Sequence, residues 1–189
     1  MSLSVVYVPD TGHVVGALSA TGATMPTGPT GPTGPTDAGS LLGSLVGDAL
    51  PVRVSLGEGE VAELALRAGQ LAVLAADDEP AVFADPLAYG VESVPDAPSK
   101  PALLRLASWS TGLTLTTERL VVTVPVANQS QTTKVLALVS DGQDTLVLAG
   151  EIPVQQDMVT LPVTVRSGRH GVLVLVAGWA GRLEALTTA

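Results

Sequence analysis

Short runs of hydrophobic and β-branched residues recur along this chain at roughly ten-residue intervals, with turn-forming residues between them. Such runs, bounded by Gly, Pro, Asn, Asp or Ser, are typical of β-strands. In residues 102–189 the expected strands are Ala102–Ala107, Leu113–Leu115, Arg119–Val126, Lys134–Val139, Thr145–Ala149, Met158–Val165, Gly171–Ala177 and Arg182–Leu186. The pattern predicts an all-β chain whose last domain, 102–189, is an antiparallel β-sandwich, Ig-like or jelly-roll-like.

The N-terminal residues 1–20 are expected to form a separate β-hairpin. Ser4–Val8 is a β-branched and aromatic run, Pro9–Gly12 has turn chemistry, and His13–Leu18 supplies the returning strand. Two strands alone are only marginally stable in water. The hairpin must therefore pack against either the rest of the chain or a neighbouring subunit.

Residues 21–40 have a different composition and are expected to form a Pro/Gly-rich linker. The segment Met25–Thr36 repeats the triplet Gly-Pro-Thr. Proline fixes φ and lacks a backbone donor, so this segment is predicted to be stiff and to resist pairing into a sheet. The hairpin followed by such an arm is the feature that most favours an assembly function.

Residues 41–101 are expected to form a small β-rich region. A short helix over 40–50, ended by Pro51, is one interpretation of the spacing of its leucines, and a turn-rich loop is the alternative. The expected strands are Val52–Leu56, Val61–Leu66 and Leu71–Ala75. The prolines after residue 79 predict an irregular connection over 80–101.

Composition narrows the classes of partner. The chain carries 18 acidic against 9 basic residues, a formal net charge of −9, so we expect neither nucleic acid nor an anionic membrane surface as a partner. No hydrophobic run is long enough for a membrane span, and the chain has no cysteine. Residues 1–10 have neither the basic nor the apolar region of a signal peptide, so a cytoplasmic or particle-associated location is expected.

Few residues carry recognisable chemistry. Asp10-Thr11-Gly12 matches the tripeptide of aspartic peptidases, but a single copy could act only in a dimer, and a hairpin turn is the favoured interpretation. The acidic residues Asp77, Asp78, Glu79 and Asp85 lack EF-hand spacing. We therefore predict no enzyme activity, no metal site and no cofactor, and keep a dimeric aspartic peptidase as the remote alternative.

The sequence thus predicts a non-catalytic structural or assembly subunit of a larger complex, for example a phage-tail-like or shell-like particle. Its partners are expected to be proteins, in a homo- or hetero-oligomer. The alternative is a recognition module that binds a ligand through its loops. The candidate interaction residues are Val6, Val8 and His13 on the hairpin for the first function, and Arg169, His170 and Trp179 for the second.

Overall fold

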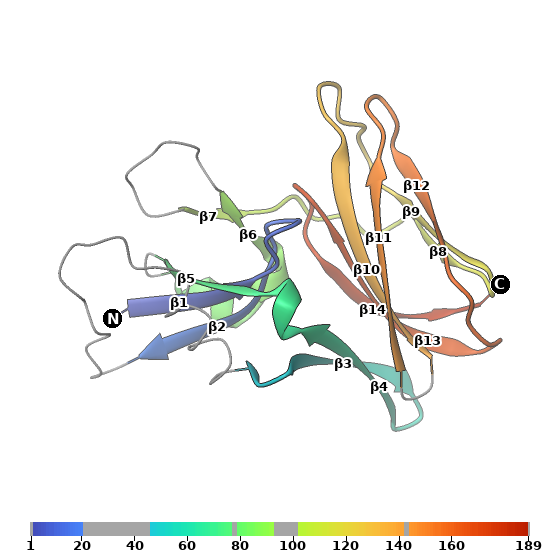
Figure 1. The fold of residues 1–189 in the computed structure, drawn as a ribbon, viewed down its shortest axis with the longest axis horizontal. Helices are drawn as coiled ribbons and strands as arrows, with labels where there is room; N and C mark the ends of the chain where they lie inside the picture. The colour runs from blue at the N-terminus through green and yellow to red at the C-terminus, as the bar shows by residue number, and fades with distance from the viewer. Residues whose placement is uncertain (1, 21–45, 77–78, 93–101, 142–143, 189) are drawn as a thin grey trace. The chain divides into compact units, whose positions relative to one another are not determined.

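The computed structural model describes residues 2–20, 46–76, 79–92, 102–141 and 144–188, and in these ranges the chain is all-β (Figure 1). The strands are β1 (Ser2–Tyr7), β2 (Val14–Ala20), β3 (Ala49–Gly57), β4 (Glu60–Arg67), β5 (Ala72–Ala76), β6 (Tyr89–Glu92), β7 (Ala102–Arg105), β8 (Leu113–Leu115), β9 (Arg119–Thr123), β10 (Thr133–Asp141), β11 (Asp144–Ile152), β12 (Met158–Pro162), β13 (Arg169–Val176) and β14 (Arg182–Thr187). Three short 3-10 helices accompany them in these ranges: η1 (Ala68–Gln70), η2 (Pro80–Phe83) and η3 (Pro86–Ala88).

Two expectations fall wholly or partly outside the described residues. The Gly-Pro-Thr arm over 21–40 lies outside them. The helix expected over 40–50 lies partly outside, and its last two residues, Ala49 and Leu50, belong to strand β3. The β-branched residues that follow, Val52 and Val54, continue that strand, which pairs with β4.

The chain divides into two compact units, and the division passes within β3 and β4. An N-terminal unit comprises residues 1–50 and 66–106, and a C-terminal unit comprises residues 51–65 and 107–189. The sequence-based boundaries at residues 41 and 102 stay predictions.

The N-terminal hairpin is confirmed, and it packs against the rest of its own unit. Strand β1 pairs with β2 on one side and with β5 on the other, so β1 is the central strand of a three-stranded antiparallel sheet. Successive side chains of a strand point to opposite faces. Leu3 and Val5 accordingly share one face and lie in a buried core with Val14, Val82 and Tyr89.

One strand of the N-terminal unit was not expected. The sequence predicted an irregular connection over 80–101, but Tyr89–Glu92 forms strand β6, which pairs with β7 in antiparallel register. Two further backbone hydrogen bonds hold this segment in place. Val91 N–H donates to Gly12 O, and Leu106 N–H donates to Ala88 O, both at 2.8 Å. Partners distant in the sequence therefore make this segment a strand.

The C-terminal unit contains a four-stranded sheet, β11-β10-β13-β14, and a three-stranded sheet, β12-β9-β8. Every strand expected after residue 112 is present within a few residues of its predicted bounds. Side chains from both sheets share one buried core, among them Leu120, Val135, Leu161 and Val174. The Ig-like or jelly-roll-like arrangement of this domain stays a prediction.

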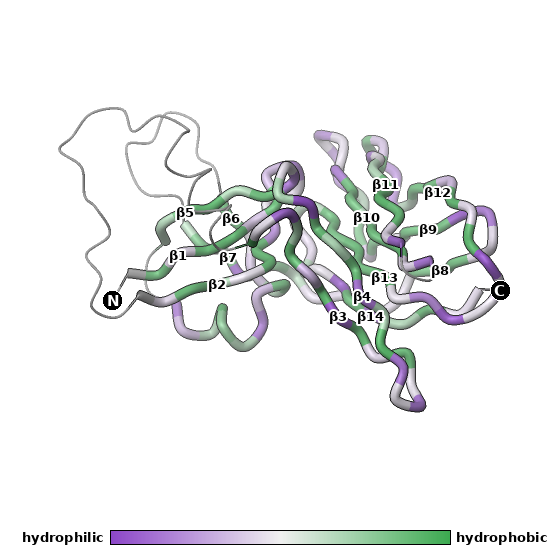
Figure 2. Tube along the Cα trace, turned by 60° about the horizontal axis from the view of Figure 1, so that its bottom comes forward, coloured by the Kyte–Doolittle hydropathy of each residue, from purple (hydrophilic) through white to green (hydrophobic). Residues whose placement is uncertain are grey.

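Strands β10 and β13 are buried on both faces, which explains their nearly continuous hydrophobic sequences (Figure 2). Val172 and Val174 belong to the shared core, and Leu173 and Leu175, on the opposite face, are equally buried. Hairpin β3–β4 lies on this second face near Gly171. A Cβ atom at Gly171 would lie only 2.6 Å from Val54 Cγ1 and 2.7 Å from Ala62 Cβ.

Candidate functional site

Strand β11 forms a free edge of the four-stranded sheet and is the best candidate for a functional surface. It is nine residues long and pairs along its whole length with β10. In the described part of the C-terminal unit, no strand pairs with its other side. An unpaired edge presents a row of backbone N–H and C=O groups to any chain that can align with it.

The pairing pattern identifies which residues present these groups. Ala177 N–H donates to Lys134 O at 3.0 Å, so the even-numbered residues of β10 bond toward β13. The odd-numbered residues of β10 therefore bond toward β11, where their partners are the even-numbered residues Leu146, Leu148 and Gly150. It follows that the odd-numbered residues of β11, including Val147 and Ala149, direct their backbone groups away from the sheet.

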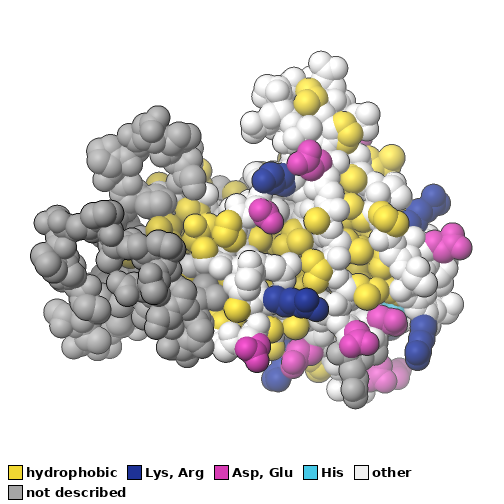
Figure 3. All heavy atoms as spheres, viewed as in Figure 1, with side chains coloured by type: hydrophobic (Ala, Val, Ile, Leu, Met, Phe, Trp, Pro, Cys, Tyr) yellow, Lys and Arg dark blue, Asp and Glu magenta, His cyan; other side chains and the backbone are white. Residues whose placement is uncertain are grey.

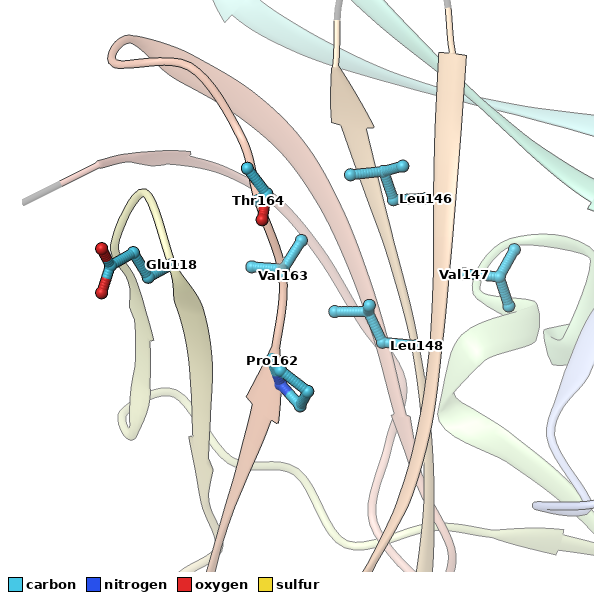
Figure 4. Close-up of a pocket in the computed structure, with 7 residues that line it drawn as sticks. All are labelled: Glu118, Leu146, Val147, Leu148, Pro162, Val163 and Thr164. Atoms are coloured by element: carbon cyan, nitrogen blue, oxygen red, sulfur yellow. The ribbon is translucent and has the colours of Figure 1, made fainter.

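An open groove of about 400 Å³ runs beside this edge, on the face that carries the shared core (Figure 4). Leu146 and Leu148 of β11 line one wall, and Pro162 and Val163 line the other. Figure 4 shows Leu146 and Leu148 directed toward Val163, whereas Val147 points to the opposite side of the strand. Glu118 supplies the one carboxylate among the lining residues.

The edge of β11 also lacks the features that usually prevent unwanted pairing. Its sequence carries no charge between Asp144 and Glu151, and it contains no proline. Other edges of this unit are shorter or charged, since β8 has three residues, β12 ends at Pro162, and β14 carries Arg182 and Glu184. In Figure 3, hydrophobic side chains gather over the part of this unit where β11 and β12 lie. Proteins normally blunt their edges by charge, proline or short length, so β11 is chemically suited to pairing.

The candidate residues on the N-terminal hairpin are not on the surface. Val6, Val8 and His13 are 4%, 1% and 0% exposed, respectively. His13 Nδ1 lies 2.9 Å from Thr11 Oγ1, and both side chains are buried next to the hairpin turn. The side chains of Val6, Val8 and His13 are therefore inaccessible to a partner in the folded chain.

The candidate residues of the recognition alternative do not form one surface. Arg169 and His170 begin β13, whereas Trp179 follows its other end, about 20 Å away at ~3.3 Å per residue. His170 is buried, and both of its ring nitrogens face backbone oxygens, with Nδ1 2.5 Å from Ser140 O and Nε2 2.8 Å from Arg166 O. Trp179 is half-buried against the shared core.

Trp109 lies in the core of the C-terminal unit. Its side chain is buried, and its indole N–H donates to Ala180 O at 2.8 Å. The guanidinium of Arg182 lies 4.6 Å from the centre of the indole ring and also pairs with Glu184 at 2.6 Å. This cluster fixes the start of β14 against residues 109–111, because Arg182 donates to Ser110 O and Thr111 O.

The segments with candidate chemistry have local structural roles. Asp10 is exposed in the hairpin turn, where Gly12 has a φ of 77° and its N–H donates to Val8 O. Glu79 accepts a hydrogen bond from Ala81 N–H at the start of η2, while Asp77 and Asp78 lie outside the described residues. Across the described ranges, no group of three or more His, Cys, Asp or Glu side chains is placed to hold a metal ion.

No helix in those ranges has the length and apolar character needed to cross a membrane.

Comparison with known proteins gives this chain no relative: no family model, no curated protein and no solved structure matches it. The edge described above must therefore be judged by its own chemistry.

The sequence predicts the strand Thr145–Ala149 but not that this strand forms the edge of a sheet. The one feature of the sequence that could have indicated an edge open to pairing is the uncharged run Leu146–Gly150, but such a run is equally typical of a strand that is paired on both sides. Only the strand order distinguishes these two cases.

Proposed function

We propose that this chain is a non-catalytic structural or assembly subunit of a larger protein complex. The observation that supports this function is the free edge of β11 beside an apolar groove lined by Leu146, Leu148 and Val163. Main-chain pairing along such an edge supplies affinity, and an adjacent groove that accepts side chains supplies specificity. A sheet with an unprotected edge is the arrangement expected of a subunit that joins others.

A protein is the expected partner because the edge offers backbone hydrogen bonds that another strand can complete. The groove is open and mostly apolar, and its chemistry does not select a particular small molecule. A strand from another protein would satisfy the outward backbone groups of Val147 and Ala149 and cover the leucines at the same time. The net charge of −9 further favours a protein over a polyanion.

Sedimentation of a gentle extract from cells that produce this chain tests the proposal. The endogenous chain should migrate far ahead of a free 19.1 kDa protein. A tagged Val147→Lys variant added to the same extract serves as a control and should remain in the light fractions, because a lysine on an edge opposes pairing. Endogenous chain found only at the mass of the free protein would contradict an assembly function.

A further inference from the structure

We propose that the partner at this edge is a second copy of the chain, and that the two β11 strands pair in antiparallel orientation with Leu148 opposite Leu148. The two four-stranded sheets would then join into one continuous sheet across a twofold axis. This inference rests on the proposed assembly function and names its first contact.

Backbone geometry selects this register. The outward groups belong to the odd-numbered residues, so a second strand must place odd-numbered residues opposite one another to form hydrogen-bonded pairs. With Leu148 at the twofold axis, Val147 faces Ala149 of the second copy and Thr145 faces Glu151. This is also the register in which all nine residues of β11 overlap. Every outward N–H and C=O group from Thr145 to Glu151 thus finds a partner.

The charges agree with antiparallel self-pairing. Asp144 and Glu151 lie near opposite ends of the strand. In the proposed register Asp144 faces Ile152 and Glu151 faces Thr145, so no carboxylate lies opposite another. A parallel arrangement would place each acidic residue beside its own copy, which is destabilising.

The groove can receive the side chains that the second copy would place on the core face of the sheet. Residues opposite one another in neighbouring strands share a face and lie about 5 Å apart. Leu148 of the second copy would therefore enter the groove beside Leu148, where Pro162 and Val163 form the far wall (Figure 4). Leu146 of the second copy would lie beside Gly150, over which the side chains of Leu161 and Val159 already pack, so it would extend this apolar surface rather than enter an empty space. The edge is complementary to itself in both backbone and side chains, and this favours a second copy over an unrelated strand.

Light scattering after size exclusion, over a series of protein concentrations, tests the pairing on the full-length chain. Wild type should form a dimer, and salt should strengthen it by screening the net charge of −9 on each copy. Ala149→Pro removes an outward N–H and places a ring in the path of the second strand, so the dissociation constant should rise by about tenfold or more. The matched control is Ala185→Pro on β14, the opposite edge of the same sheet, where the alternation also directs the N–H outward. This control should leave the dimer unchanged.

Hydrogen exchange gives a second readout that needs no substitution. In the monomer, the amides of Leu146 and Leu148 should be protected by β10, and those of Val147 and Ala149 should exchange quickly. Raising the protein concentration should protect Val147 and Ala149 specifically. If Ala149→Pro fails to fold, the Val147→Lys variant and this exchange pattern decide the question.

Three results would overturn the inference: a wild-type monomer at all concentrations, equal weakening by Ala185→Pro, or a dimer in which Val147 and Ala149 stay unprotected. A purified monomer together with an endogenous chain in heavy fractions would remove self-pairing and leave the assembly function standing. A purified monomer together with an endogenous chain that stays in the light fractions would contradict both self-pairing and the assembly function.

Discussion

Gly171 on β13 offers the most direct test of how hairpin β3–β4 packs in the C-terminal unit. A Cβ atom at this position would lie 2.6 Å from Val54 Cγ1 and 2.7 Å from Ala62 Cβ, much closer than the optimum of about 3.5–4.0 Å between carbon atoms. Gly171→Ala should therefore force the hairpin and the sheet apart locally. Overpacking of this kind typically lowers the free energy of unfolding by about 1–3 kcal/mol.

The size of the effect can be measured by urea or thermal unfolding monitored by tryptophan fluorescence. Both tryptophans, Trp109 and Trp179, lie in the C-terminal unit, so the signal reports on the unit that is perturbed. For a unit of roughly 100 residues, a loss of about 1–3 kcal/mol corresponds to a decrease in Tm of about 4–20 °C. Gly69→Ala in the N-terminal unit is the control for a glycine replaced without a clash, because a Cβ atom there meets nothing within 4 Å. Its effect, followed by calorimetry, should stay within about 0.5 kcal/mol.

A double-mutant cycle separates this steric contact from a general effect of alanine in the strand. Ala62→Gly removes one of the atoms that the new methyl group would meet, so Gly171→Ala should cost less in its presence by about 0.5 kcal/mol or more. Additive effects, or a Gly171→Ala variant as stable as wild type, would refute the packing of the hairpin on β13.

Two further substitutions test the cores of the two units. Leu3→Ala should lower the stability of the N-terminal unit by about 2–5 kcal/mol, because Leu3 is 1% exposed. Leu18→Ala on the same hairpin, where the side chain is 41% exposed, should cost much less. Similar losses for the two variants in calorimetry would show that the hairpin is not integrated in the sheet. Trp109→Phe should lower the stability of the C-terminal unit by about 1–3 kcal/mol, since it leaves Ala180 O without its indole donor, and an unchanged calorimetric transition would contradict that role.

Local patterns in the sequence were sufficient for most of the strands. The two-residue alternation and the turn residues predicted the hairpin of β1 and β2, the strands from β8 to β14, and β4. The turn between β3 and β4 also depends on local residues, because Gly57 and Gly59 both adopt positive φ, at 97° and 85°, which glycine accommodates without strain. In each case the deciding interactions lie within a few residues of the chain.

The candidate surface could not be obtained in this way. The sequence pattern predicted interaction residues at Val6, Val8 and His13 because an isolated hairpin would expose them, but in the folded chain all three side chains are buried. Strand β5, distant in the sequence, also pairs with the edge of β1 that an isolated hairpin would leave free. Arg169 and Trp179 were expected to bind one ligand through loops, yet Arg169 begins β13 and Trp179 follows its other end.

Local sequence pattern is therefore enough to predict that this chain is built from strands and where most of them begin and end, and composition shows that it is acidic. The pairing of the strands, the existence of β6 and the free edge of β11 beside a groove emerge only when the chain is folded. Hydrophobic alternation fixes the conformation and the faces of a strand locally, whereas its neighbours in a sheet depend on hydrogen bonds between residues far apart in the chain.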